Sequence, residues 1–166
     1  LFKNTFQDIE NIMTLGYENG TRFEFECYDV GHLYNLHYYH REGMLKAPYF
    51  IQFVMGIMGG IGADSDNLLH MKKTADKLFG EDYQWSVVGA GATQMRINAT
   101  GAALGSHVRV GLEDSLWDGP GNLARKNADQ VKRVREILEG LSLEVATSDE
   151  AREILDLKGK DNTNIK

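Results

Sequence analysis

The sequence has very little cysteine, no long apolar segment and no block of basic residues. Cys27 is its one cysteine, which excludes an internal disulfide and favours a reducing compartment, so we expect a cytoplasmic protein. No apolar run reaches the roughly 18 residues that a membrane-spanning helix requires, which argues against a membrane protein. The net charge of −6, without clustered Lys and Arg, argues against nucleic acid as a partner.

The chain also lacks an initiator methionine and any signal-peptide pattern at its start. It begins with Leu1, and we therefore expect the 166 residues to be part of a longer protein. Their composition, 42% hydrophobic and 25% charged, is that of an ordinary globular domain. The length is sufficient for one domain with a sizeable core.

Helical and strand patterns alternate along the chain. They predict strands at about 22–28, 49–54, 83–88 and 107–111, and helices from residue 6 and at about 31–42, 64–79, 94–104, 123–141 and 147–155. Strands that alternate with helices of this length are typical of parallel strands joined by right-handed crossovers. We therefore predict an α/β fold in which four parallel strands form either a small open sheet or half of an eight-stranded barrel.

The segment 107–114, HVRVGLED, carries the most chemical information. Because strand residues alternate between faces, Arg109, Gly111 and Glu113 are expected on one side of a strand that ends in the acidic pair Glu113 and Asp114. A buried arginine beside a buried carboxylate is expensive in free energy. The pattern indicates either a functional site or an ion pair that holds a loop, and the residues alone leave both open.

Two carboxylates also share one face of the first predicted strand, Glu24 and Glu26, together with Tyr28. In a barrel mouth they would bind a cation, an amine or a substrate held by a metal. On an exposed edge strand of an open sheet they would be ordinary surface residues. Both interpretations stay open at this point.

Two further features suggest anion binding without proving it. The run 55–62, MGIMGGIG, follows a strand and precedes a helix, so the backbone amides around Gly59 and Gly60 could cradle phosphates. It lacks the Lys-Ser/Thr ending of a Walker motif, and a tight turn explains it equally well. Asn127, near the start of the long helix, is a candidate for an anion site at a helix N-terminus or for simple capping.

Five segments together resemble the β-keto acid cleavage enzyme family, whose best-known member is 3-keto-5-aminohexanoate cleavage enzyme. They are EFECYDVGHL at 24–33, QFVMGIMGGIG at 52–62, WSVVGAG at 85–91, VRVGLED at 108–114 and ATSDEAREIL at 146–155. Family members are (β/α)₈ barrels of nearly twice this length. The resemblance therefore implies that residues 1–157 form the C-terminal half of a TIM barrel. This half would contain strands five to eight and a C-terminal helix, and residues 158–166 would form a polar, flexible tail.

The resemblance also implies a reaction and roles for particular residues. The family converts a β-keto acid and acetyl-CoA to acetoacetate and a new acyl-CoA, with a Zn²⁺ held by a His-x-His pair and one glutamate. By motif, Glu113 would be that glutamate, and Arg109 and Asp114 the dyad that generates the attacking carbanion. Glu26, or Glu24 in another register, would face a substrate that carries an amino group.

The resemblance has further consequences for partners. The His-x-His pair would come from a missing N-terminal half-barrel, so the chain alone is expected to be inactive, and its parent to form a homo-oligomer. Where many members have Gly-Arg near the Gly-Ala-Gly turn, this chain has Ala92 and Thr93, which puts its contacts with CoA phosphates in doubt. Two rival hypotheses are a non-enzymatic half-barrel that serves binding or assembly, and a flavodoxin-like nucleotide binder built on the glycine run.

Overall fold

The computed structural model describes residues 3–163, which divide into two compact units. One unit, which we call the sheet unit, comprises residues 25–145, and the other, the terminal unit, combines residues 3–24 with 146–163. None of the described helices is long and apolar enough to cross a membrane.

The terminal unit contains α1 (Phe6–Glu18), α6 (Ser148–Ile154) and a short 3₁₀ turn (Lys160–Asn162). Both helices begin with a capping box, from Thr5 in α1 and from Thr147 in α6, because Ser or Thr followed three residues later by Asp or Glu satisfies the first free amides of a helix. An ion pair joins Arg22 to Asp156. Of the predicted tail, Lys158 donates to the Asn19 carbonyl at 3.0 Å, and residues 164–166 lie outside the described part.

The sheet unit contains the alternating strands and helices that the sequence predicts. Its first strand, β1, begins at Glu24, one residue before the unit. Its elements are β1 (Glu24–Cys27), α2 (Val30–Arg41), β2 (Tyr49–Met55), α3 (Ser65–Phe79), β3 (Tyr83–Gly89), a 3₁₀ turn (Gly91–Thr93), α4 (Gln94–Ala103), β4 (His107–Val108) and α5 (Asn127–Gly140). The strands lie in the order β1-β2-β3-β4. The predicted α/β fold with four parallel strands is confirmed.

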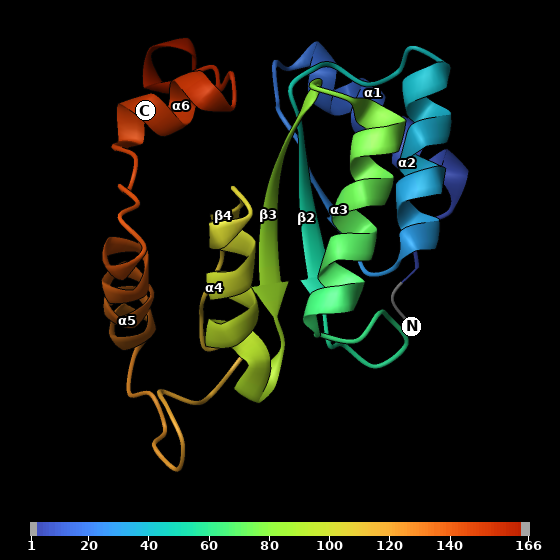
Figure 1. The fold of residues 1–166 in the computed structure, drawn as a ribbon. Helices are drawn as coiled ribbons and strands as arrows, with labels where there is room; N and C mark the ends of the chain where they lie inside the picture. The colour runs from blue at the N-terminus through green and yellow to red at the C-terminus, as the bar shows by residue number, and fades with distance from the viewer. Residues whose placement is uncertain (1–2, 164–166) are drawn as a thin grey trace. The chain divides into compact units, whose positions relative to one another are not determined.

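The two central strands form the core of this unit, where β2 and β3 run side by side in the same direction (Figure 1). Their seven-residue pairing runs from Tyr49 opposite Tyr83 to Met55 opposite Gly89. Nearly all of their residues are buried, as expected for parallel strands that are covered on both faces. The carboxyl ends of both strands therefore meet at one edge, and the loops that follow them lie there.

The predicted fourth strand is wrong in length, since β4 comprises His107 and Val108 and not 107–111. The backbone amide of Arg109 still donates to the Val87 carbonyl at 3.1 Å. Beyond it the chain turns, because the Gly111 carbonyl accepts hydrogen bonds from the amides of Asp114 and Ser115 at 3.2 and 3.0 Å. The alternation of faces expected up to Glu113 is thus replaced by a tight turn.

The predicted long helix at 123–141 begins later, since α5 spans Asn127–Gly140. The four residues before it belong to a loop that closes on itself. Trp117 and Leu123 form an isolated antiparallel bridge, and the Ala124 amide donates to the Leu116 carbonyl at 2.9 Å. These contacts occupy the backbone of residues 123 and 124, so the helix cannot begin there.

Candidate active site

The backbone of Arg109 is held by a side chain from α4. Asn98, which is fully buried, donates through Nδ2 to the Arg109 carbonyl at 2.9 Å and accepts through Oδ1 from the Arg109 amide at 3.2 Å. The amide of Asn98 thereby takes the place of a neighbouring strand at the point where β4 ends. Arg109 consequently starts from a fixed backbone position at the carboxyl edge of the sheet.

The guanidinium of Arg109 is the centre of a polar cluster. Its Nε and Nη2 form a fork with the two carboxylate oxygens of Asp114, at 3.2 and 3.3 Å. Its Nη1 donates to Glu26 Oε1 at 2.9 Å and to Gln52 Oε1 at 2.8 Å, and its Nη2 also donates to Glu113 Oε2 at 3.0 Å. A guanidinium carries five N–H donors in a fixed plane, so these five contacts determine its orientation.

The cluster has two further members, of which the sequence pattern placed Tyr28 on the face of Glu26 but did not single out Gln52. Gln52 is buried in β2 and donates through Nε2 to Ser86 Oγ at 3.0 Å, its partner in the register of β2 and β3. Tyr28 donates through its hydroxyl to Glu26 Oε2 at 2.9 Å. A glutamine in the otherwise apolar run YFIQFVM was the signal that could have identified Gln52, since buried polar side chains need partners.

The three carboxylates of the cluster differ in solvent exposure. The side chain of Asp114 is 12% exposed, that of Glu26 38% and that of Glu113 84%, while Arg109 is 32% exposed. The expectation of a buried arginine beside a buried Glu113 is therefore wrong, since Arg109 and Asp114 are partly buried and Glu113 is exposed. Glu24 belongs to the exposed residues of β1, so it is Glu26 that meets the guanidinium.

The electrostatics of the cluster act in opposite directions on its two central groups. Burial raises the pKa of Asp114, Arg109 opposes this, and Glu113 and Glu26 raise the pKa further. Burial alone would lower the pKa of Arg109, but the attraction of Asp114, Glu26 and Glu113 raises it. Asp114 is thus a carboxylate with a pKa above its ordinary value that is held against a permanent cation.

The glycine-rich loop after β2 uses its backbone amides internally. The amides of Gly56 and Gly60 donate to carbonyls within the loop, and the amide of Ile61 donates to the Tyr28 carbonyl at 2.8 Å. A Cβ on Gly60 would lie 2.5 Å from that same carbonyl oxygen, and Gly59 has a φ of +90°. Turn geometry and contact with the end of β1 therefore explain both glycines without a phosphate.

The strand order also bears on the flavodoxin-like hypothesis. That hypothesis requires a point at which the strand order reverses, whereas the four described strands follow one another in sequence order.

Asn127 lies at the first residue of α5, where it holds a loop. Its Oδ1 accepts a hydrogen bond from the Leu112 amide at 2.8 Å, within the turn that leads from Arg109 to Asp114. The side chain therefore ties the helix to the active-site turn. This contact favours the structural interpretation of Asn127 over an anion site.

A carboxylate held by a bidentate arginine at the carboxyl edge of parallel strands suits the removal of a proton from carbon. The arginine keeps the carboxylate ionised and oriented, while the partial burial raises its basicity. Catalytic residues of α/β barrels lie at this edge of the sheet.

Comparison with protein families connects this geometry to known proteins. The model of the β-keto acid cleavage enzyme family matches residues 1–157. The chain belongs to this family. It is 57% identical over 165 residues to 3,5-dioxohexanoate:acetyl-CoA acetone transferase of Paraburkholderia graminis, covering 99% of the chain and 53% of that protein. It is 34% identical to 3-keto-5-aminohexanoate cleavage enzyme of Fusobacterium nucleatum, covering 95% of the chain and 56% of that protein.

The chain thus spans about half the length of these members of the β-keto acid cleavage enzyme family. A solved structure described as the binary complex of ObcA with oxaloacetate shares the fold, with a TM-score of 0.71 at 20% identity. The match covers 93% of this chain and 42% of that one.

The zinc ion that the resemblance to the β-keto acid cleavage enzyme family implies has no complete set of ligands among residues 3–163. No group of three or more His, Cys, Asp and Glu side chains in that range could hold a metal. Glu113, exposed at the edge of the cluster, offers a single carboxylate. The described residues therefore do not form a zinc site on their own.

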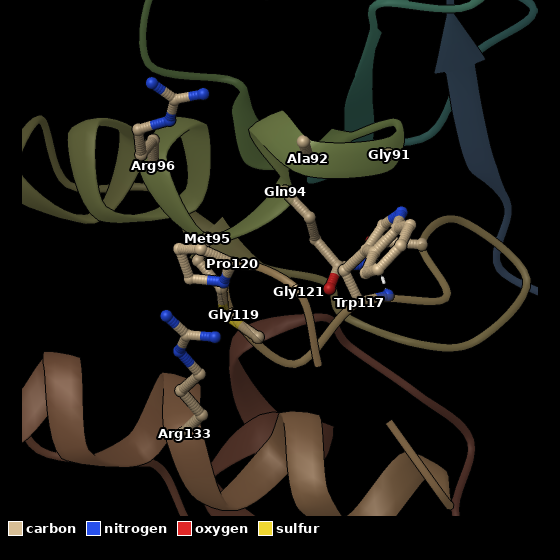
Figure 2. Close-up of a pocket in the computed structure, with 11 residues that line it drawn as sticks. Gly91, Ala92, Gln94, Met95, Arg96, Trp117, Gly119, Pro120, Gly121 and Arg133 are labelled. Carbon is tan, nitrogen blue, oxygen red and sulfur yellow. Dashed lines mark hydrogen bonds between the residues drawn. The ribbon is translucent and has the colours of Figure 1, made fainter. Parts of the chain in front are cut away.

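A cavity of about 560 Å³ borders the segment that follows Asp114. It is bounded by the Gly91–Thr93 turn, the start of α4, the loop 115–121 and Arg133 of α5 (Figure 2). The Gly91 amide donates to the Asp114 carbonyl at 2.7 Å, and Ser115 lines the cavity. The cavity and the Arg109 cluster therefore share the segment 114–115.

Proposed function

We propose that this chain forms the C-terminal half of a (β/α)₈ barrel that cleaves β-keto acids with acetyl-CoA. The observation that carries the proposal is the fork between Arg109 and Asp114, placed at the carboxyl edge of consecutive parallel strands. The family membership and the shared use of acetyl-CoA in the names of its relatives support it.

In this proposal Asp114 is the base and Arg109 its positioning residue. Asp114 takes a proton from the carbon between the carboxylate and the keto group of the substrate, and the resulting carbanion attacks the thioester carbon of acetyl-CoA. The new carbon–carbon bond forms as the CoA thiolate leaves. The thiolate then attacks the original keto carbon, the older carbon–carbon bond breaks, and the acetoacetate carbanion recovers the proton from Asp114. The products are acetoacetate and an acyl-CoA.

The far end of the substrate is the part that Glu26 would contact. Relatives act on substrates with an amino group, as in 3-keto-5-aminohexanoate, or without one, as in 3,5-dioxohexanoate. In this chain both carboxylate oxygens of Glu26 already accept hydrogen bonds, one from Arg109 and one from the Tyr28 hydroxyl, before any substrate binds. We therefore propose a substrate whose far end is uncharged, of the 3,5-dioxo acid type.

We also propose that Glu113 supplies one ligand to a zinc ion, and that the remaining ligands come from outside this chain. Three carboxylates around one guanidinium leave an excess of negative charge, which favours a divalent cation. When bound, zinc would polarise the keto oxygen. The roles of Asp114 and Arg109 described above do not depend on its geometry.

The proposal is tested with a chimera, which we call the completed enzyme. It joins all 166 residues to the preceding part of the Paraburkholderia graminis relative. We expect acetoacetate to form from 3,5-dioxohexanoate and acetyl-CoA, more slowly from 3-keto-5-aminohexanoate, and not at all with the 166-residue chain alone. The zinc content of the completed enzyme, measured in parallel, should fall in the Glu113→Gln variant.

The competing hypothesis is a half-barrel that serves binding or assembly without catalysis. It predicts a folded, associated chimera that forms no acetoacetate from either substrate, and that result would reject our proposal. Size-exclusion chromatography with light scattering on the same sample tests the expected homo-oligomer.

A further inference from the structure

The cavity beside Asp114 is not used by the mechanism above, although it opens one residue away from the proposed base. Its volume of about 560 Å³ lies within the roughly 300–1,000 Å³ of small-molecule sites. Its wall continues into the Asp114 segment, because the Gly91 amide donates to the Asp114 carbonyl and Ser115 lines the cavity.

One buried polar atom in the wall of this cavity lacks a partner. The side chain of Gln94 is 2% exposed, and its Nε2 donates to the Gly111 carbonyl at 3.1 Å, which fixes the orientation of the amide. Its Oε1 has no hydrogen-bond partner among the described residues. Leaving such a buried oxygen without a partner destabilises the folded state, and an N–H donor from a ligand would remove that cost.

The remaining wall is largely apolar but includes two arginines, Arg96 of α4 and Arg133 of α5. In Figure 2 the Arg96 guanidinium points away from Arg133. Trp117 is 44% exposed, and Met95 and Pro120 complete the apolar surface. In Figure 2 the Gln94 side chain extends from the start of α4 toward Trp117, and Arg133 rises from α5 toward Gly119 and Pro120. The Arg133 guanidinium lies 3.5 Å from Asp118 Oδ1.

The ligand that fits has an amide N–H for Gln94, an apolar body for Trp117 and a phosphate for Arg133. We propose that this cavity binds the phosphopantetheine arm of acetyl-CoA, with a pantetheine amide donating to Gln94 Oε1 and the diphosphate facing Arg133. The inference rests on the proposed function, because that function requires acetyl-CoA at this edge of the sheet. It assigns CoA to the 3₁₀ turn and α4 and not to the glycine-rich loop after β2.

The test is isothermal titration of the completed enzyme with CoA and with 4′-phosphopantetheine. We expect both to bind, and Gln94→Met to weaken each about tenfold, the value of one hydrogen bond. Arg133→Gln should weaken CoA binding about tenfold. Arg135 is an exposed arginine of the same helix, and Arg135→Gln should leave the CoA affinity unchanged. Asp118→Asn should strengthen CoA binding about two- to fivefold, because it releases Arg133 from an exposed ion pair.

The Asp118→Asn variant distinguishes a binding role of Arg133 from a structural one, because a damaged fold would not bind CoA more tightly. Unchanged CoA affinity in Gln94→Met, or phosphopantetheine that fails to bind, would overturn the inference. Failure of the proposed function is distinct, because CoA would then bind at this cavity without acetoacetate being formed.

Discussion

The two ends of the same sheet are built from opposite chemistry. At the carboxyl end, one guanidinium gathers three carboxylates of graded exposure. At the amino end, aromatic rings close the space between the strands and two helices, and ring centroids lie 5.5–6.0 Å apart; the members are His37, His40, Tyr49, Phe79 and Tyr83. The first pair in the register of β2 and β3, Tyr49 and Tyr83, belongs to this aromatic end.

Both tyrosine hydroxyls of the aromatic end have hydrogen-bond partners. The Tyr49 hydroxyl lies 2.9 Å from His40 Nδ1, and the Tyr83 hydroxyl donates to Asp76 at 2.8 Å. The charged end instead leaves an excess of carboxylates over cations, which disfavours the folded state. We expect stability to be concentrated at the aromatic end and the proposed chemistry at the charged end, a division known in α/β barrels.

Asp114→Asn, at the charged end, should have the largest effect, which is a loss of kcat. The asparagine keeps the shape and removes the base, so kcat of the completed enzyme should fall by about 10²–10⁴-fold, the contribution of general base catalysis. Stopped assays of acetoacetate measure the loss, and the unfolding temperature should stay close to that of the parent. Retention of more than a tenth of the activity would show that another group removes the proton.

Phe79→Ala should break the aromatic end. The ring is 3% exposed and contacts four other rings, so its removal should cost about 3–5 kcal/mol of unfolding free energy. Urea unfolding of the completed enzyme measures the cost, with Tyr34→Ala, a half-exposed aromatic of α2, as the control. The folded fraction should retain its kcat, and a selective loss of kcat would contradict the division between the two ends.

The predictability of the two ends differs for a physical reason. The aromatic and apolar strands follow from periodicity, so β2, β3 and the starts of α1 and α6 were predicted to within one residue. The cluster depends on contacts between distant segments. Motif resemblance pointed to Arg109 and Asp114, but the role of Asn98 as a substitute strand partner follows no local rule. That side chain also explains why β4 is shorter than predicted.

Gly60→Ala tests the contact between the glycine-rich loop and β1. A methyl group there would approach the Tyr28 carbonyl to 2.5 Å. Because the backbone fixes the position of a Cβ and the contacted oxygen is itself backbone, the overpacking should cost about 1–3 kcal/mol. Thermal unfolding measures it, with Gly31→Ala as a control, since a Cβ at Gly31 meets nothing within 4 Å. CoA affinity should change little if the cofactor lies at α4, whereas a loss as large as that of Arg133→Gln would favour the loop as the CoA site.

In the metal-free protein, Glu113→Gln should give the smallest effect, a shift in the pKa of Asp114. The Glu113 carboxylate raises the pKa of Asp114, after burial and against Arg109, so its removal should lower that pKa. Arg109→Gln should move it the opposite way, since the guanidinium lowers the pKa. Carbon-13 NMR of the Asp114 carboxyl against pH, without added metal, measures both directions independently of turnover. Equal shifts of the same sign in the two variants would mean that a change in burial, and not charge, controls this carboxylate.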